Sequence, residues 1–112
     1  MDSAARDETD DDRVVRILLV EDVLPLLELE KSYLKRTTCR VLTARTGSQA
    51  LKLCRRDPPD LVFLDAAMPD IDGLAACRFL KADPLAGRVP VVLIASPERR
   101  EECARAGCDG VL

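Results

Sequence analysis

Short runs of consecutive apolar residues alternate along the chain with segments that have helical spacing. Three of these runs have four residues each and contain β-branched side chains with no polar interruption: residues 17–20, 61–64 and 91–94. Continuous runs of this length are typical of strands in a parallel sheet that helices cover on both faces. A weaker run at 40–44 predicts a fourth strand nearer an edge, and a fifth strand is expected to begin at Gly110.

Helix-start signals and helical spacing occupy the gaps between the first runs. Pro25 suits the first position of a helix, and the apolar residues after it form one stripe: Leu26, Leu27, Leu29, Tyr33 and Leu34. Thr46 and Gln49 have the spacing of a capping box, which opens a second helix that carries Ala50, Leu53 and Cys54.

Two more helices are predicted in the second half of the chain. The third follows Gly73, stops near Asp83, and has one apolar face made by Ala76, Phe79 and Leu80. Ser96 and Pro97 are typical of the N-cap and first position of a fourth helix, which ends at Gly107. Strands and helices therefore alternate, which predicts right-handed crossovers and a doubly wound parallel sheet of the α/β class.

Acidic residues lie directly after two of the strand-like runs. Glu21 and Asp22 follow the run 17–20, and Asp65 follows the run 61–64. The ligand sites of such sheets lie beyond the carboxyl ends of the strands, so we expect the three carboxylates to converge there. Converging like charges are costly unless a cation joins them, and Mg²⁺ takes carboxylates together with water and phosphate oxygens. A carboxylate beside Mg²⁺ can attack a phosphoryl group; simple solvation or helix capping by each acid is the alternative.

The composition restricts the available chemistry to carboxylates, hydroxyls and thiols. The 112 residues fit one domain, are 47% apolar and include no His and no Trp, which removes imidazole bases and most stacking platforms for nucleic acid. The five cysteines form no C-x-x-C pair, so we expect small buried side chains in a reducing cytoplasm rather than disulfides or a zinc site. No apolar stretch approaches the roughly 18 residues of a membrane span, so no membrane association is expected.

Charge is distributed unevenly along the chain. Residues 1–12 hold six acids and one base, and we expect them to form an acidic, disordered leader. Residues 13–112 form the predicted domain and carry 14 acids and 16 bases. A domain with nearly balanced charge lacks the basic face that binds a nucleic-acid duplex, so no nucleic-acid partner is expected.

Four segments together resemble the receiver domain of two-component response regulators: residues 17–22, 60–73, 90–94 and 106–110. The second segment is the most specific, because Met68-Pro69 and Asp72-Gly73 follow Asp65 at the receiver spacing. The resemblance covers residues 14–112 and implies a flavodoxin-like fold with strand order 2-1-3-4-5. In that fold this chain is expected to be truncated at the start of the fifth strand, before the final helix.

The resemblance also implies a role for each residue at the carboxylate edge. Asp65 would be the phosphoacceptor, Asp22 would bind Mg²⁺ directly, and Glu21 would bind it mainly through water. Ala67 would add its backbone carbonyl as a further metal ligand. The loop over the site would be shaped by Met68, Pro69 and Gly73, which are equally compatible with an ordinary turn into a helix.

Three positions depart from the receiver pattern. Receivers usually carry a Thr or Ser that contacts the phosphoryl oxygens where Ala95 stands, and the neighbouring Ser96 is equally suited to capping a helix. Val111 occupies the position of the aromatic switch residue, and the expected phosphate-binding Lys would lie beyond Leu112.

Three functions remain in competition. The first is a receiver that takes a phosphoryl group onto Asp65 from a sensor histidine kinase or phosphotransfer protein and signals by a conformational change to a downstream protein or effector domain. Such a receiver is not an enzyme beyond its own phosphorylation and dephosphorylation, and it could form a homodimer through the fourth helix and fifth strand. The second is a non-switching pseudo-receiver that only binds proteins, which Ala95 and Val111 favour. The third is a small Mg²⁺-dependent phosphohydrolase, which needs an acid where Ala67 stands.

Overall fold

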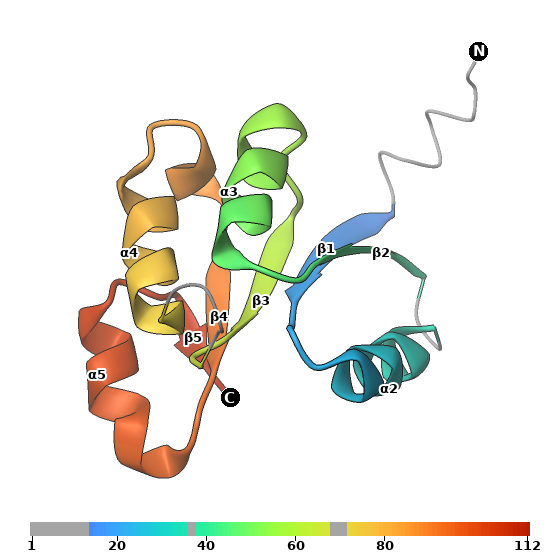
Figure 1. Ribbon diagram of the computed structural model, residues 1–112. Helices are drawn as coiled ribbons and strands as arrows, with labels where there is room; N and C mark the ends of the chain where they lie inside the picture. Colours follow the sequence, from blue (N-terminus) through green and yellow to red (C-terminus); the bar gives the residue numbers. More distant parts are fainter. Residues whose placement is uncertain (1–13, 36–37, 68–71) are drawn as a thin grey trace.

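Five parallel strands form one sheet in the order β2-β1-β3-β4-β5 (Figure 1). The computed structural model describes residues 14–35, 38–67 and 72–112, apart from the side chain of Leu26. The strands are β1 Val15–Val20, β2 Cys39–Ala44, β3 Leu61–Asp65, β4 Val91–Ile94 and β5 Gly110–Val111. The predicted α/β class and the flavodoxin-like order 2-1-3-4-5 are confirmed, whereas the expectations for the 1–12 leader, Met68 and Pro69 lie outside the described residues.

The strand register brings the carboxyl ends of the central strands to one level. Val20 of β1 pairs with Ala44 of β2 on one side and with Leu64 of β3 on the other. Asp65, the last residue of β3, pairs with Ile94 of β4. Residues that follow β1 therefore lie beside Asp65.

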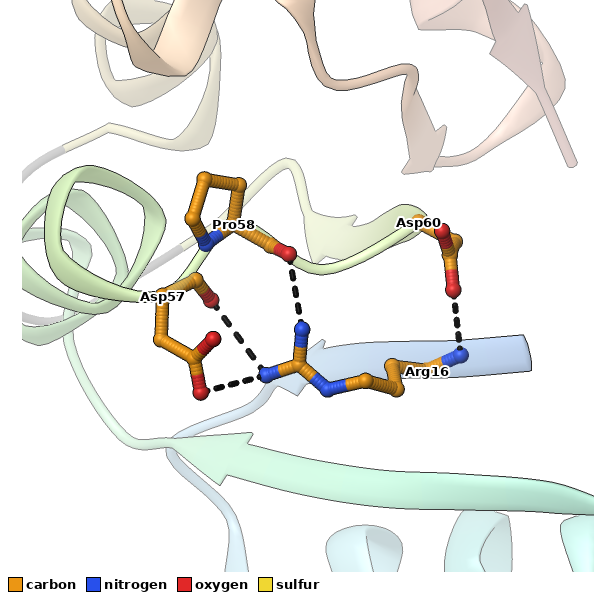
Figure 2. Close-up of polar contacts among 4 residues, drawn as sticks. All are labelled: Arg16, Asp57, Pro58 and Asp60. Carbon is orange, nitrogen blue, oxygen red and sulfur yellow. Dashed lines mark hydrogen bonds and ion pairs between the residues drawn. The ribbon is translucent and has the colours of Figure 1, made fainter. Parts of the chain in front are cut away.

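Polar contacts at the amino ends of β1 and β3 fix the register of these two strands (Figure 2). The backbone N–H of Arg16 donates to the Asp60 carboxylate at 2.7 Å, and the N–H of Asp60 donates to the Arg16 carbonyl at 2.8 Å. The Arg16 guanidinium donates to the carbonyl of Pro58 at 2.8 Å and to the carboxylate of Asp57 at 2.7 Å. Since a one-residue slip would turn every β3 side chain to the other face, these contacts also help to hold Asp65 at its level.

Helices cover the two faces of the sheet unequally. On one face lie α3 Gly47–Arg56, α4 Gly73–Ala82 and α5 Arg100–Arg105, and on the other lies α2 Leu24–Leu34 (Figure 1). Short 3₁₀ helices at Ala86–Arg88 and Pro97–Arg99 flank β4. The larger core lies under the three helices and includes Leu18, Leu64 and Leu93.

Strands β3 and β4 are not buried on both faces as their continuous apolar runs predict. Val62 and Leu64 are fully buried under α3 and α4, whereas Leu61 and Phe63 on the α2 face are only partly buried. The reason is that α2 packs over β1 and β2, with Ile17 and Leu19 buried beneath it, and leaves β3 and β4 partly uncovered among the described residues.

Two of the predicted helical stripes are wrong in part. Leu27 is buried, but Leu29 and Tyr33 of α2 and Phe79 of α4 are 53%, 67% and 60% exposed. A single helix over a narrow part of the sheet buries only the residues that point directly at it. In α4, Ala76 and Leu80 are buried as predicted, while Phe79 borders a surface hollow between α3 and α4.

The helix starts differ in how well they match their sequence signals. Thr46 accepts a hydrogen bond from the N–H of Gln49 at 3.1 Å, as the capping box predicts. Ser96 stands at the N-cap position with Pro97 after it, as predicted, but its side chain makes no capping hydrogen bond and the helix that it precedes is a 3₁₀ helix. The chain forms one 3₁₀ turn after Ser96, closed by the N–H of Arg99 donating to the Ser96 carbonyl at 3.0 Å, before α5 begins.

The cysteines are all free thiols, and three of them are buried: Cys54, Cys77 and Cys103. Burial raises the pKa of both Cys54 and Cys77 to about 11, which is expected of small apolar side chains in a core. Cys39 and Cys108 are partly exposed. Within the described part of the chain, no helix has the length and apolar character needed to cross a membrane.

Candidate functional site

Three carboxylates converge at the carboxyl edge of the sheet. Glu21, Asp22 and Asp65 each offer one oxygen, and these oxygens all lie within 4.8 Å of one another. The register explains the convergence, because Val20 pairs with Leu64 and each is followed directly by an acid. The structure thus brings together the three acids that the strand-end pattern singles out.

Glu21 is the deepest of the three, with 2% of its surface exposed. Its N–H donates to the Ala44 carbonyl at 3.0 Å, which extends the ladder between β1 and β2 by one residue. Its carboxylate accepts a hydrogen bond from the N–H of Val23 at 3.3 Å. Burial raises the pKa of Glu21 to about 7, the Val23 hydrogen bond opposes this rise, and the negative charge of Asp65 adds to it.

Asp65 is half-buried, and one of its two carboxylate oxygens is held by the backbone. The N–H of Ala67 donates to Oδ1 of Asp65 at 2.9 Å. This bond fixes the orientation of the carboxyl group, and among the described residues Oδ2 accepts no hydrogen bond. The carbonyl of Ala67 as a metal ligand stays a prediction.

Gly73 allows α4 to begin directly against the end of β3. Its N–H donates to the carbonyl of Ala66 at 2.8 Å, and a Cβ at this position would lie only 2.1 Å from the carbonyl oxygen of Asp65. Asp72 precedes it as the N-cap of α4 and accepts a hydrogen bond from the N–H of Leu74 at 3.1 Å. A residue with a side chain at Gly73 would push the helix away from Asp65.

The donor set fits a hard divalent cation. It consists of carboxylate oxygens, which Mg²⁺ prefers over nitrogen or sulfur ligands. The raised pKa of the buried Glu21 shows how poorly the site tolerates its own negative charge without a cation. Within residues 14–35, 38–67 and 72–112, the ion pairs of Lys and Arg involve other acids than these three.

The remaining predicted positions lie around this edge without a hydroxyl or an aromatic ring in contact with the acids. Ala95 follows Ile94, which pairs with Asp65, and its N–H donates to the Leu112 carbonyl at 3.2 Å. Ser96 is exposed. Val111 of β5 pairs with Leu93 of β4 and packs against the core.

Sequence reasoning missed two charged residues at the site. Arg45 follows β2 directly, so the strand-end rule that selected the acids would also have found it; its Nη2 donates to the Asp22 carbonyl at 3.2 Å. Glu30 comes from α2, and its pKa is raised by burial and by Asp65 while a hydrogen bond with Glu21 opposes the rise. No sequence signal distinguishes Glu30 from Glu28, the other acid on its helix.

Comparison with protein families and with curated proteins gives a consistent result. The response regulator receiver domain family matches residues 17–112. Response regulator PleD of Caulobacter vibrioides is 41% identical over 85 residues, which are 76% of this chain and 19% of PleD. The polar-differentiation response regulator DivK of Brucella ovis is 26% identical over 99 residues, covering 86% of this chain and 80% of DivK. The chain thus spans about a fifth of PleD.

Solved structures show the same fold. The receiver domain of the sensor histidine kinase PA1611 from Pseudomonas aeruginosa superposes with a TM-score of 0.81 at 29% identity, covering 88% of this chain and 84% of that one. Its crystal structure has a magnesium ion coordinated in the active site cleft.

Proposed function

The chain belongs to the response regulator receiver domain family, and on that premise we propose that Asp65 accepts a phosphoryl group in a two-component phosphorelay. One observation carries the proposal: Asp65 ends a central strand with its carboxylate within 4.8 Å of those of Glu21 and Asp22. A single acid at a strand end could simply be solvated by water. Three carboxylates at one point repel one another, and a divalent cation would offset that repulsion and could assist phosphoryl transfer.

The residues around Asp65 are suited to nucleophilic attack. The N–H of Ala67 holds Oδ1, so Oδ2 is the oxygen that attacks the phosphorus atom. With a phosphohistidine donor, the P–N bond breaks, its electron pair stays on the imidazole nitrogen, and an acyl phosphate forms on Asp65. With acetyl phosphate, the P–O bond breaks and acetate leaves. Mg²⁺ held by Glu21, Asp22, Asp65 and the Ala67 carbonyl would offset the charge of the phosphoryl oxygens.

Receiver domains are phosphoacceptors rather than typical enzymes, and they interact with histidine kinases and effector domains. For this chain we propose a sensor histidine kinase or phosphotransfer protein as donor and a downstream protein or effector domain as target. A homodimer through α5 and β5 belongs to the same proposal. The site of action is the cytoplasm, which the five free thiols support.

Phosphorylation of Asp65 is tested by incubation with acetyl phosphate and Mg²⁺, followed by intact mass spectrometry. We expect one added phosphoryl group in the parent, none in Asp65→Asn, and an unchanged label in Glu28→Gln, a control acid exposed on α2. A label that survives in Asp65→Asn would assign the acceptor elsewhere. An unlabelled parent would instead support the non-switching module. Ala95, the residue after β4, is consistent with that alternative because it offers no hydroxyl to the phosphoryl oxygens.

A further inference from the structure

We propose that Arg45 captures the anionic phosphoryl group of the phosphodonor at the rim of the carboxylate site. This inference rests on the proposed phosphorylation of Asp65 and adds a residue that determines how well the donor binds. It is independent of which protein or small molecule carries the phosphoryl group.

Arg45 lies beside the acids because β2 lies beside β1. Ala44, the last residue of β2, accepts the hydrogen bond of the Glu21 N–H at 3.0 Å. From the next residue the Arg45 side chain reaches across to the loop after β1, where Nη2 donates to the carbonyl of Asp22 at 3.2 Å. A positive charge is therefore held against the backbone of Asp22, which is itself a predicted metal ligand.

The base of this side chain is fixed by the start of α3. The backbone N–H of Arg45 donates to Oε1 of Gln49 at 2.7 Å, and the N–H of Gln49 donates to the Thr46 hydroxyl at 3.1 Å. Arg45, Thr46, Gln49 and Asp22 line a surface hollow of about 470 Å³, enough for a small anion. Arg45 thus borders an open space beside Asp22 rather than a packed interface.

The guanidinium has donors to spare. In the described part of the chain the guanidinium makes one hydrogen bond, through Nη2, whereas a guanidinium carries several N–H groups in a planar fork. That fork matches the oxygens of a phosphoryl group in a bidentate arrangement. Arg99, the cation beside the start of α4, is already paired with Asp72 and Glu102.

The positive charge of Arg45 would reduce the repulsion between the carboxylate site and an anionic phosphodonor. Three carboxylates repel an anionic donor, and one divalent cation offsets them only in part. A fixed positive charge at the rim lowers that repulsion and raises the local concentration of anions. The contribution is larger here because Ala95 supplies no hydroxyl on the β4 side.

The test compares Arg45→Ala with the control Lys52→Ala. Both variants lose one positive charge, and Lys52 is an exposed residue of α3, the helix that follows Arg45. Phosphorylation rates are measured by intact mass spectrometry against acetyl phosphate concentration at saturating Mg²⁺. We expect Arg45→Ala to raise the half-saturating donor concentration about tenfold, the value of one charge-assisted hydrogen bond, with an unchanged limiting rate. Arg45→Lys should recover part of the loss, and Lys52→Ala should match the parent.

Two results separate the failure of this inference from the failure of the proposed function. If the parent is labelled and Arg45→Ala has the same half-saturating concentration as Lys52→Ala, the role of Arg45 is refuted and Asp65 stands. If the parent takes no label, the proposed function fails, and an NMR titration with inorganic phosphate and Mg²⁺ decides the role of Arg45 separately. A shift of the Arg45 Nε–H signal supports anion capture, and an unmoved signal overturns it.

Discussion

Replacing Glu21 by Gln should stabilise the metal-free protein above neutral pH. Glu21 has 2% of its surface exposed, and burial with the charge of Asp65 raises its pKa from 4.5 to about 7. Gln keeps the shape of the side chain and can still accept the hydrogen bond of the Val23 N–H, but it never ionises. The variant therefore removes the cost of burying a carboxylate and leaves the packing unchanged.

The sign and size of the effect follow from proton binding. Between pH 4.5 and about 7, the folded protein holds a proton on Glu21 that the unfolded chain has released, so the stability of the parent falls as pH rises. Above pH 7 the loss is complete and amounts to about 3 kcal/mol, since each pKa unit corresponds to about 1.4 kcal/mol. Glu21→Gln should show no such loss.

The assay is urea unfolding in EDTA, followed by circular dichroism, at about pH 5 and pH 8. We expect Glu21→Gln to gain most of its advantage at the higher pH, and Glu28→Gln, an exposed acid of α2, to follow the parent. Added Mg²⁺ should reduce the pH dependence of the parent, because a cation favours the ionised carboxylate. An advantage that is equal at both pH values would refute the reasoning, since Glu21 would then ionise normally in the folded protein.

Two further predictions concern packing and thiol reactivity. Gly73→Ala should lower the free energy of unfolding in urea titration by more than about 4 kcal/mol, because its Cβ would lie 2.1 Å from the Asp65 carbonyl oxygen. The control Gly110→Ala should fold normally, since its Cβ would lie 3.5 Å from Val92. Equal stability of the two variants would contradict this packing. Cys39 and Cys108 should react with a thiol reagent well before the buried Cys54 and Cys77, whose pKa values are raised to about 11. Peptide mapping by mass spectrometry measures the order of reaction. Equal rates at all four cysteines would contradict the burial of Cys54 and Cys77.

The sheet and the carboxylate cluster could be predicted from the sequence because both depend on local signals. The run 91–94 matches β4 residue for residue, and the other strands differ from their predicted bounds by at most two residues at an end. Acids at strand ends converge whenever the register is level, and Val20 pairing with Leu64 makes it so. The strand order came from the family resemblance, since alternation of strands and helices gives only the parallel, doubly wound class.

The errors arose where burial depends on what packs against an element rather than on its own pattern. Leu29, Tyr33 and Phe79 have helical spacing but lie at the margins of their contacts with the sheet and with α3, so they remain exposed. Phe63 is only partly buried because α2 packs over β1 and β2. The side chain of Ser96 is not used as a cap because the chain first forms a 3₁₀ turn. Arg45 follows β2 as the acids follow β1 and β3, but a cation at a strand end is not a metal ligand and so does not belong to the carboxylate pattern.

The central claim is that Asp65 is the phosphoacceptor, and chemical mapping of the phosphorylated residue tests it most directly. The protein is treated with acetyl phosphate and Mg²⁺, reduced with borohydride to convert an aspartyl phosphate into homoserine, digested, and sequenced by mass spectrometry. We predict homoserine at position 65 and at no other Asp, with none formed when Mg²⁺ is replaced by EDTA. Homoserine at Asp22, Asp70 or Asp72, or none at any position in the treated protein, would contradict the account.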